Sequence, residues 1–109
     1  MASRPMDLLQ GTVDVLILRS LADGPRHGYD VSRWVRERTA GTLQIEDAPL
    51  YKAFRRLEHA GCLAAEWGLS ESNRRARYYR LTPAGRKRLR HETSAWRRYA
   101  DAVFLVLRP

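Results

Sequence analysis

The stretch "CLAAEWGLSESNRRARYYRLTPAG", residues 62–85, decides the fold. Apolar residues alternate with other residues on both sides of a polar cluster at residues 70–74, a pattern typical of a two-stranded hairpin. The alternating residues are Leu63, Ala65, Trp67, Leu69, Tyr79 and Leu81. Thr82 and Pro83 then begin a helix, because threonine is a good N-cap and proline suits the first helical position. The stretch therefore predicts a β-hairpin that leads directly into a helix.

Three segments with apolar residues at helical spacing precede the hairpin. They span residues 8–25, 26–41 and 46–61. In the first segment, Thr12 or Gln10 could begin the helix. In the third, Asp47 is a suitable N-cap, Pro49 suits the first turn and Gly61 ends the helix. The hairpin is therefore preceded by three predicted helices.

The order of these elements predicts the fold class. Three helices followed by a hairpin indicate a winged helix-turn-helix, so we expect an α+β protein that is mainly α. Residues 1–81 form the winged helix-turn-helix domain in this prediction. Residues 82–109 form a long C-terminal dimerisation helix, in one compact unit with that domain. A chain of 109 residues is long enough for one domain with a single modest core.

Positive charge is concentrated in the middle and late part of the chain. The net charge is +8. Residues 1–46 carry six charges of each sign, whereas residues 47–98 carry thirteen Lys and Arg against five Asp and Glu. A localised basic surface is typical of proteins that bind nucleic acid or an anionic membrane. The alternative is an Arg-rich surface that serves only solubility.

The helix at residues 46–61 and the tip of the hairpin carry the residues that we expect to bind DNA. A helix fits the major groove, and arginine can donate two hydrogen bonds to one guanine. An arginine at the tip of a hairpin can enter the minor groove or contact phosphate. The helix residues are Tyr51, Lys52, Arg55 and Arg56, and the hairpin residues are Asn73, Arg74, Arg75 and Arg77.

Other interpretations of these charges stay open. The basic helix face can be a solvated face, and Arg80 can pair with Glu66 across the strands. A module that binds an acidic protein and a structural RNA-binding protein are two further functional alternatives. A DNA reader would show sequence-dependent affinity and a steep salt dependence. The protein-binding module would show no preference among duplexes, and the RNA-binding protein would prefer RNA.

The C-terminal helix carries an apolar seam with spacings of 4, 3, 4, 3 and 4 residues. The seam consists of Leu89, Thr93, Trp96, Ala100, Val103 and Leu107, with Phe104 beside it. Heptad spacing predicts that a second copy covers the seam, so we expect a homodimer. The alternative is packing on the first helix and residues 7–9, and a long helix can do both. Trp96 and Tyr99 could line a flat aromatic pocket, although Trp96 in a core is the plainer interpretation.

Signals for metal binding and catalysis are weak. His59 and Cys62 lie three residues apart, as do His27 and Asp30, but neither pair completes a ligand set. We expect no metal and no resident cofactor. The sequence has no Gly-rich phosphate loop, GxSxG or HExxH motif, so we expect no enzyme. A single cysteine and the lack of a long apolar run predict a cytoplasmic protein.

The arrangement resembles the PadR family of bacterial transcriptional regulators. The matching segments are "LLQGTVDVLILRSLADGPRHGYDV" at 8–31, "PLYKAFRRLEHAGCLAAEW" at 49–67 and "RRARYYRLTPAGR" at 74–86. They occur in the order and spacing of the family and cover about half of the chain. The resemblance implies a winged-helix dimer of the short PadR-like subfamily, which binds operator DNA and usually acts as a repressor.

The resemblance also implies roles for particular residues. Tyr51 would contact the DNA backbone, and the helix at residues 46–61 would read bases. The family usually has Ser or Gly followed by Ser before "LY", whereas this chain has Ala48 and Pro49. A serine donor to phosphate is therefore missing at a helix start that we expect to lie against DNA. Family members often respond to phenolic or flat hydrophobic compounds, so Trp96 is a candidate contact for a small aromatic effector.

Overall fold

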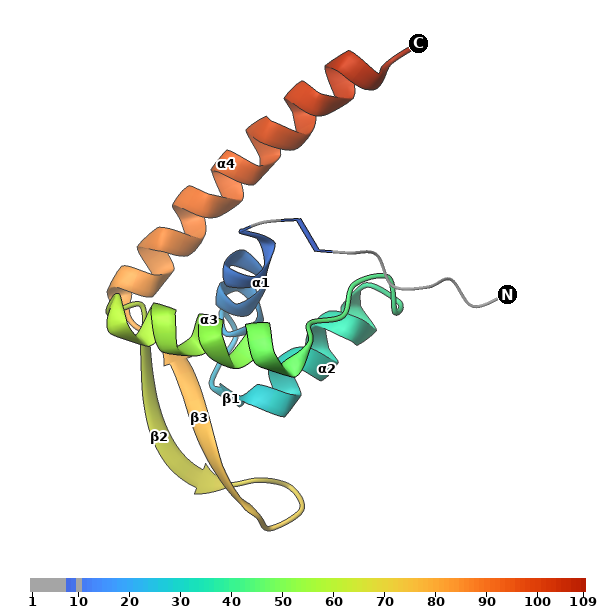
Figure 1. The fold of residues 1–109 in the computed structure, drawn as a ribbon. Helices are drawn as coiled ribbons and strands as arrows, with labels where there is room; N and C mark the ends of the chain where they lie inside the picture. Colours follow the sequence, from blue (N-terminus) through green and yellow to red (C-terminus); the bar gives the residue numbers. More distant parts are fainter. Residues whose placement is uncertain (1–7, 10) are drawn as a thin grey trace.

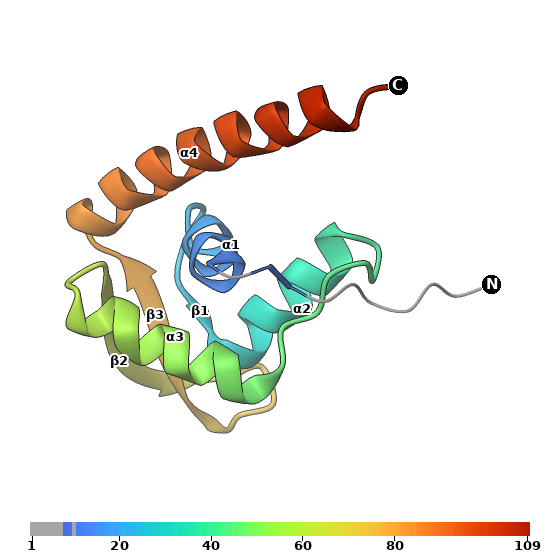
Figure 2. The same cartoon turned by 45° about the horizontal axis from the view of Figure 1, so that its top comes forward.

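A computed structural model describes residues 8–9 and 11–109. The elements are α1 (Thr12–Ser20), β1 (Arg26–His27), α2 (Gly28–Arg38), α3 (Asp47–His59), β2 (Leu63–Leu69), β3 (Arg75–Leu81) and α4 (Pro83–Leu107). Figures 1 and 2 show the three short helices and the sheet in one body, with α4 passing over α1 and extending beyond it. None of the helices described is long and apolar enough to cross a membrane. The order of the elements agrees with the predicted winged helix-turn-helix.

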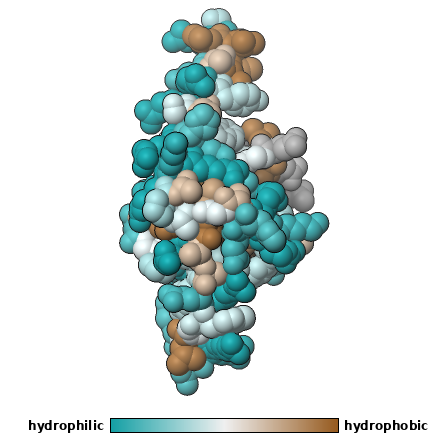
Figure 3. Space-filling model, turned by 90° about the vertical axis from the view of Figure 1, so that its left-hand side faces the viewer, coloured by the Kyte–Doolittle hydropathy of each residue, from teal (hydrophilic) through white to brown (hydrophobic). Residues whose placement is uncertain are grey.

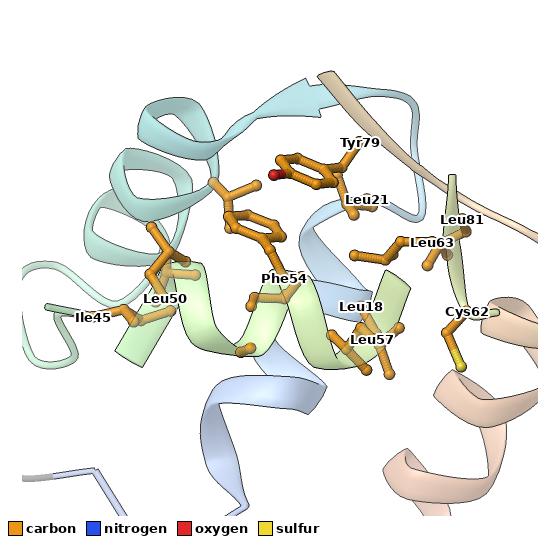
Figure 4. Packing of buried hydrophobic residues seen from close by; sticks show 14 residues of the cluster. Leu18, Leu21, Ile45, Leu50, Phe54, Leu57, Cys62, Leu63, Tyr79 and Leu81 are labelled. Carbon is orange, nitrogen blue, oxygen red and sulfur yellow. The ribbon is translucent and has the colours of Figure 1, made fainter. Parts of the chain in front are cut away.

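The core lies between the three short helices and the base of the sheet. Phe54 of α3 and Tyr79 of β3 stack with their ring centroids 4.1 Å apart and their planes 4° apart (Figure 4). Both rings are buried, and aliphatic side chains of α1, α2 and α3 pack around them. Burying aromatic rings removes a large apolar surface from water. The pair therefore fixes β3 firmly against α3.

The sheet has three antiparallel strands in the order β1-β3-β2. In β1, Arg26 pairs with Tyr79 and His27 pairs with Tyr78. The sequence predicted only a two-stranded hairpin and placed a helix from residue 26, so this third strand corrects the prediction. A strand of two residues is too short to show an alternating pattern. It forms because the otherwise open edge of β3 lies beside the start of α2.

The first helix is shorter than its predicted segment, residues 8–25. It begins at Thr12, one of the two predicted starts, and Gly11 before it has a left-handed φ of 84°. Gln10, the other predicted start, and Asp7 lie outside the described residues. After Ser20 the chain continues in turns. The N–H groups of Ala22 and Gly24 bond to carbonyls three residues earlier in the sequence, whereas an α-helix uses carbonyls four residues earlier.

The start of α3 differs from the prediction by one residue. Its N-cap is Glu46, not Asp47, and no side-chain hydrogen bond caps it. A capping side chain accepts from the N–H of the second or third helical residue. Pro49 takes the third position and has no N–H, so a side-chain cap would have one donor fewer to satisfy.

The two long strands form the wing, residues 63–81. β2 and β3 pair in one register over their whole length. The turn at residues 70–74 is closed by the N–H of Ser70, which donates to the carbonyl of Arg74 at 2.8 Å. Asn73 has a left-handed φ of 60°, a conformation that asparagine tolerates better than most residues. Asn73 therefore shapes the tip that the sequence predicted to contact DNA.

The last helix begins at the base of the wing. As predicted, Thr82 caps it by accepting from the N–H of Gly85 at 3.1 Å, and Pro83 takes the first helical position. Gly85 is buried against the backbone of Cys62. Leu89, one turn further on, packs against the core. The first turns of α4 are thus fixed to the body, whereas its outer half extends past it (Figure 1).

Gly85→Ala is expected to destabilise the fold. A Cβ at this position would fall on the carbonyl oxygen of Cys62, a backbone atom that cannot rotate away. Overpacking of this kind typically costs about 1–3 kcal/mol, which urea unfolding measures. The exposed neighbour Ala84 supplies the control, because Ala84→Ser should change the free energy of unfolding by no more than about 0.5 kcal/mol. Equal stability of Gly85→Ala and the wild type would contradict the close approach.

Candidate nucleic-acid interface

One face of α3 is apolar and buried, and the opposite face is exposed. The buried residues are Leu50, Ala53, Phe54 and Leu57. The exposed residues are Ala48, Pro49, Tyr51, Lys52, Arg55 and Arg56. Burial of the first set fixes the rotation of α3 about its own axis and turns the second set outward. The helix residues that the sequence singled out therefore lie on one accessible face.

Tyr51 lies across the start of α2. Its side chain is 42% exposed, and its ring centroid is 5.9 Å from that of Phe54. A Cβ on Gly28, the first residue of α2, would lie 2.9 Å from the hydroxyl oxygen of Tyr51. Gly28 is therefore a positioning residue for Tyr51, and the sequence analysis did not single it out. Its only signal was a glycine in the first turn of a predicted helix, where glycine is unfavourable.

A groove of about 510 Å³ separates Tyr51 and the start of α2 from the wing. Its lining includes Gly28, Arg33, Tyr51, Arg74, Arg75 and Arg77. Residues that the sequence predicted separately on a helix and on a hairpin therefore meet at one site. Four arginines and one glutamate line this groove. An open groove with this charge suits an extended polyanion.

Ion pairs hold the wing against the helices. Arg77, which was predicted to bind DNA, has its Nη2 atom 2.7 Å from Oε2 of Glu58 on α3. On the other side of the groove, Arg33 of α2 lies 3.9 Å from Glu71 in the wing turn. Pairing occupies part of the Arg77 guanidinium. The structure thus gives Arg77 an anchoring role that the sequence did not predict.

Arg56 of α3 pairs with a carboxylate on α1. Its Nη2 atom forms an ion pair with Oδ1 of Asp14 on α1, and Arg88 of α4 donates to Oδ2 of the same carboxylate at 3.3 Å. Asp14 is buried, and a buried charge needs such partners. Arg88 also donates to Glu92 at 3.0 Å. By contrast, Arg55 forms no ion pair within the part of the chain that the structure describes.

The outer part of the wing departs from the predicted alternation. Leu63 is buried at the base, but Trp67 and Leu69 are 56% and 66% exposed. The strands extend beyond the described helices (Figure 1), and these two side chains at the outer end stay exposed. The guanidinium carbon of Arg75 lies 4.4 Å from the ring centroid of Trp67. Tryptophan and arginine thus form an exposed contact near the tip.

Arg80 does not lie opposite the partner considered for it. The register places Ala64 opposite Arg80, and it places Tyr78 opposite Glu66. The considered pair assumed a register shifted by two residues. Among the described residues, no ion pair joins Arg80 to Glu66.

The apolar seam of α4 is partly covered in its first half and exposed from Val103 onward. Leu89 packs against the core, and Thr93 is exposed with its hydroxyl donating to the carbonyl of Leu89 at 2.7 Å. Trp96 is half-buried, and its ring meets that of Tyr99 edge-on at 5.9 Å. The exposed apolar residues of the outer half are Tyr99, Val103, Phe104, Leu105, Val106 and Leu107. Figure 3 shows hydrophobic atoms gathered at this end of the molecule.

The histidines and the cysteine considered as metal ligands have other neighbours in the structure. In the described residues, no three His, Cys, Asp or Glu side chains gather closely enough to hold an ion. Cys62 is buried and accepts a weak hydrogen bond from Arg88 at 3.9 Å, whereas His59 is exposed. His27 caps α2, because its Nδ1 atom accepts from the N–H of Asp30 at 3.2 Å.

Asp30 fixes the start of α2 beside the groove. It accepts from Arg33 at 2.9 Å and from Arg26 at 3.1 Å. Arg26 also donates through Nε to the carbonyl of Ser20 at 2.7 Å. Burial by itself raises the pKa of the Asp30 carboxyl, but the hydrogen bonds and charges of Arg33 and Arg26 outweigh it. The net result is a pKa below the ordinary value of 3.8.

A basic helix exposed beside a basic wing, on a core of three helices, defines a winged helix-turn-helix protein of the DNA-binding kind. The family model for the transcriptional regulator PadR-like family matches residues 17–91. The chain therefore belongs to this family and is a PadR-family transcriptional regulator, in a family whose members bind DNA. The family resemblance and the fold class predicted from the sequence are both confirmed.

Known relatives share the fold over nearly the whole chain. An uncharacterized protein of Lysinibacillus sphaericus is 31% identical over 101 residues, which are 93% of each chain. The structure of a transcriptional regulator from Clostridium thermocellum matches with a TM-score of 0.82 and 32% identity, over 91% of this chain and 93% of that one. A PadR family transcriptional regulator from Eggerthella lenta matches with a TM-score of 0.75 and 34% identity, over 90% and 83%.

Asp30→Asn is expected to make folding less sensitive to acid. The unfolded chain binds the proton of Asp30 more readily than the native state does, because the native pKa is lowered. Ionised Asp30 thus contributes stability above about pH 4, and this contribution is lost as the pH falls through the native pKa. The substitution should cost about 1–2 kcal/mol at neutral pH, and the cost should shrink in acid as the pH falls through the lowered pKa of native Asp30.

Urea unfolding at a series of pH values measures this change. Asp23→Asn is the control, because Asp23 is exposed and lies 3.5 Å from Arg19 in a surface pair. Its free energy of unfolding should change by less than about 0.5 kcal/mol. A cost of Asp30→Asn that stays constant from neutral to acid pH would contradict the assigned pKa direction.

Proposed function

We propose that this regulator is a sequence-specific repressor that binds a pseudo-palindromic operator as a homodimer. In this proposal α3 lies in the major groove, and the wing contacts the minor groove or the backbone. One observation carries the proposal: the exposed face of α3 meets the arginines of the wing at two hollows that share Arg77. Tyr51 of α3 lines the first hollow together with Arg75, and Arg55 of α3 lines the second. A basic hairpin beside a helix that enters the major groove can contact the phosphate backbone or the minor groove, and the closeness of the wing to α3 supports this role.

Arg55 is the helix residue best suited to read bases. It is exposed, and the described residues give it no ion pair, whereas Arg56 is engaged by Asp14. Lys52 is also exposed, but its ammonium is a point charge without the planar fork of arginine. Tyr51 lines the groove, is exposed, and carries a hydroxyl that suits a phosphate contact. Base reading and backbone contact are thus divided between neighbouring positions of α3.

The outer half of α4 supports the homodimer. Its exposed apolar residues surround the last turns, and such a helix end is unfavourable in water unless a partner covers it. A second copy related by a two-fold axis would bury both helix ends. It would also place two copies of α3 on half-sites about 34–36 Å apart, one turn of the duplex.

The region of Trp96 supports a response to a small aromatic effector. A depression of about 440 Å³ is lined by Leu9, Ala95, Trp96 and Tyr99. Its apolar and aromatic lining suits a flat hydrophobic or phenolic compound. Binding there would change how two copies of α4 meet, and so the spacing of the two α3 helices. We place this activity in the cytoplasm and without a resident cofactor.

Binding to the promoter of its own gene tests the repressor proposal. Fluorescence anisotropy should show a preference of at least about tenfold over a scrambled duplex, with affinity falling steeply as salt rises. Arg55→Ala should reduce this preference by about 1–3 kcal/mol. Arg56→Ala should mainly lower stability, because it leaves the buried Asp14 with one partner fewer. Absence of binding even at low salt would overturn the proposal.

Val103→Glu is expected to separate the homodimer. A carboxylate on the seam would be buried at the interface without a partner, which should raise the dissociation constant about a hundredfold. Analytical ultracentrifugation measures the change, and circular dichroism checks that the variant is folded. Arg98→Glu introduces the same side chain at an exposed position off the seam and should stay dimeric. A dimer of unchanged affinity in Val103→Glu would contradict the assigned seam.

A further inference from the structure

We propose that Trp67 is a positioning residue that holds Arg75 ready to enter the minor groove. Arg75, and not Arg74, is then the wing arginine that reads this groove. The inference rests on the DNA-binding function proposed above and names the wing contact that this function left open.

The face of the wing that looks toward α3 changes from its base to its tip. Leu81 and Tyr79 are buried, Arg77 pairs with Glu58 of α3, and Arg75 follows. These residues are spaced by two, so they share one face of the strand. Within the described residues, Arg75 is the first in this row without a partner on α3. The row thus continues beyond the protein surface, to where a duplex bound by α3 would lie.

Trp67 of β2 lies against the Arg75 guanidinium, for which the described residues supply no side-chain hydrogen bond and no ion pair. The register places Trp67 opposite Arg77, on the same face as Arg75. The guanidinium carbons of Arg75 and Arg77 lie 4.4 Å and 6.0 Å from the indole centroid. More than half of the indole is exposed. An indole this exposed contributes little to the core, and its main contact is with the Arg75 side chain, whose conformation it restricts.

A cation–π contact orders the Arg75 guanidinium without a carboxylate, whereas a salt bridge occupies its N–H groups. Arg75 can therefore donate to the O2 atom of thymine or the N3 atom of adenine in the minor groove. Because the side chain is already ordered, less rotamer entropy is lost on binding. Arg74 lies in the turn, and the described residues give its side chain no ion pair or aromatic contact.

The minor groove distinguishes A·T from G·C pairs by the amino group of guanine. Inosine lacks this group, so an I·C duplex has the minor groove of A·T with the major-groove acceptors of G·C. The experiment measures binding to alternating A·T, I·C and G·C duplexes of equal length at one salt concentration. The I·C and G·C duplexes share the major-groove acceptors that Arg55 would read, so they differ for this protein only in the minor groove. The wild type should bind the G·C duplex at least about fivefold more weakly than the I·C duplex.

Two pairs of variants separate the roles of the residues. Arg75→Ala should abolish the preference, whereas Arg74→Ala removes the same charge and should weaken all three duplexes equally. Trp67→Leu keeps an apolar side chain without the ring and should reduce the preference by about two- to fivefold. Trp67→Phe keeps a ring and should retain most of the preference. An unchanged affinity of Trp67→Leu for the G·C duplex would show that the wing is still folded.

The outcomes that overturn the inference are distinct. A full preference in Trp67→Leu, or its loss in Arg74→Ala but not in Arg75→Ala, would assign the minor groove to another residue. Equal binding of all three duplexes by the wild type would refute minor-groove reading but leave the DNA-binding function standing. Absence of binding to any duplex at low salt would instead refute the DNA-binding function on which the inference rests.

Discussion

The stacked rings of Phe54 and Tyr79 determine how the surface of this molecule is arranged. One ring belongs to the inner face of α3 and the other to the inner face of β3, and their planes are nearly parallel. Because each element has one buried face, this contact also sets the direction of each exposed face. The exposed face of α3 and the row of arginines on the wing consequently meet, with Tyr51 beside Arg75 in one hollow and Arg55 beside Arg77 in another. A single apolar contact thus organises a polar surface.

The arginines of this protein divide into two groups with different physical surroundings. Arg56 and Arg77 lie close to carboxylates on neighbouring elements and join those elements together. In the described structure Arg55 and Arg75 have no such carboxylate, and their charge faces solvent. Burial of Asp14 explains part of this division, because the cost of a buried carboxylate is offset by nearby cations. Net charge alone therefore overstates the surface available to a polyanion.

Periodic patterns were sufficient to predict most of the fold and the accessible face of α3. A long helix or strand repeats its pattern of apolar residues, so the buried stripe around Phe54 could be predicted from the sequence. The helix start at Thr82 could also be predicted, because threonine followed by proline is a local start signal. β1 has only two residues and no period. The pair of Arg56 and Asp14 joins residues 42 positions apart, and no local pattern predicts such a pair. Exposure of Trp67 depends on where the helices stop covering the wing, which is a property of the assembled fold.

The joint between the wing and α4 contains no linker. Thr82 follows the last residue of β3 directly, and its hydroxyl donates to the carbonyl of Gly61 at 2.6 Å. Its N–H donates to the carbonyl of Cys62 at 3.1 Å. The 25 residues of α4 and the seven of β3 therefore leave the core from one rigid corner. β3 is fixed there by the stack of Tyr79 on Phe54, and α4 is fixed there by Gly85 and Leu89. The same few contacts thus set the directions of both the wing and the long helix, so a change at this corner would misalign the two together.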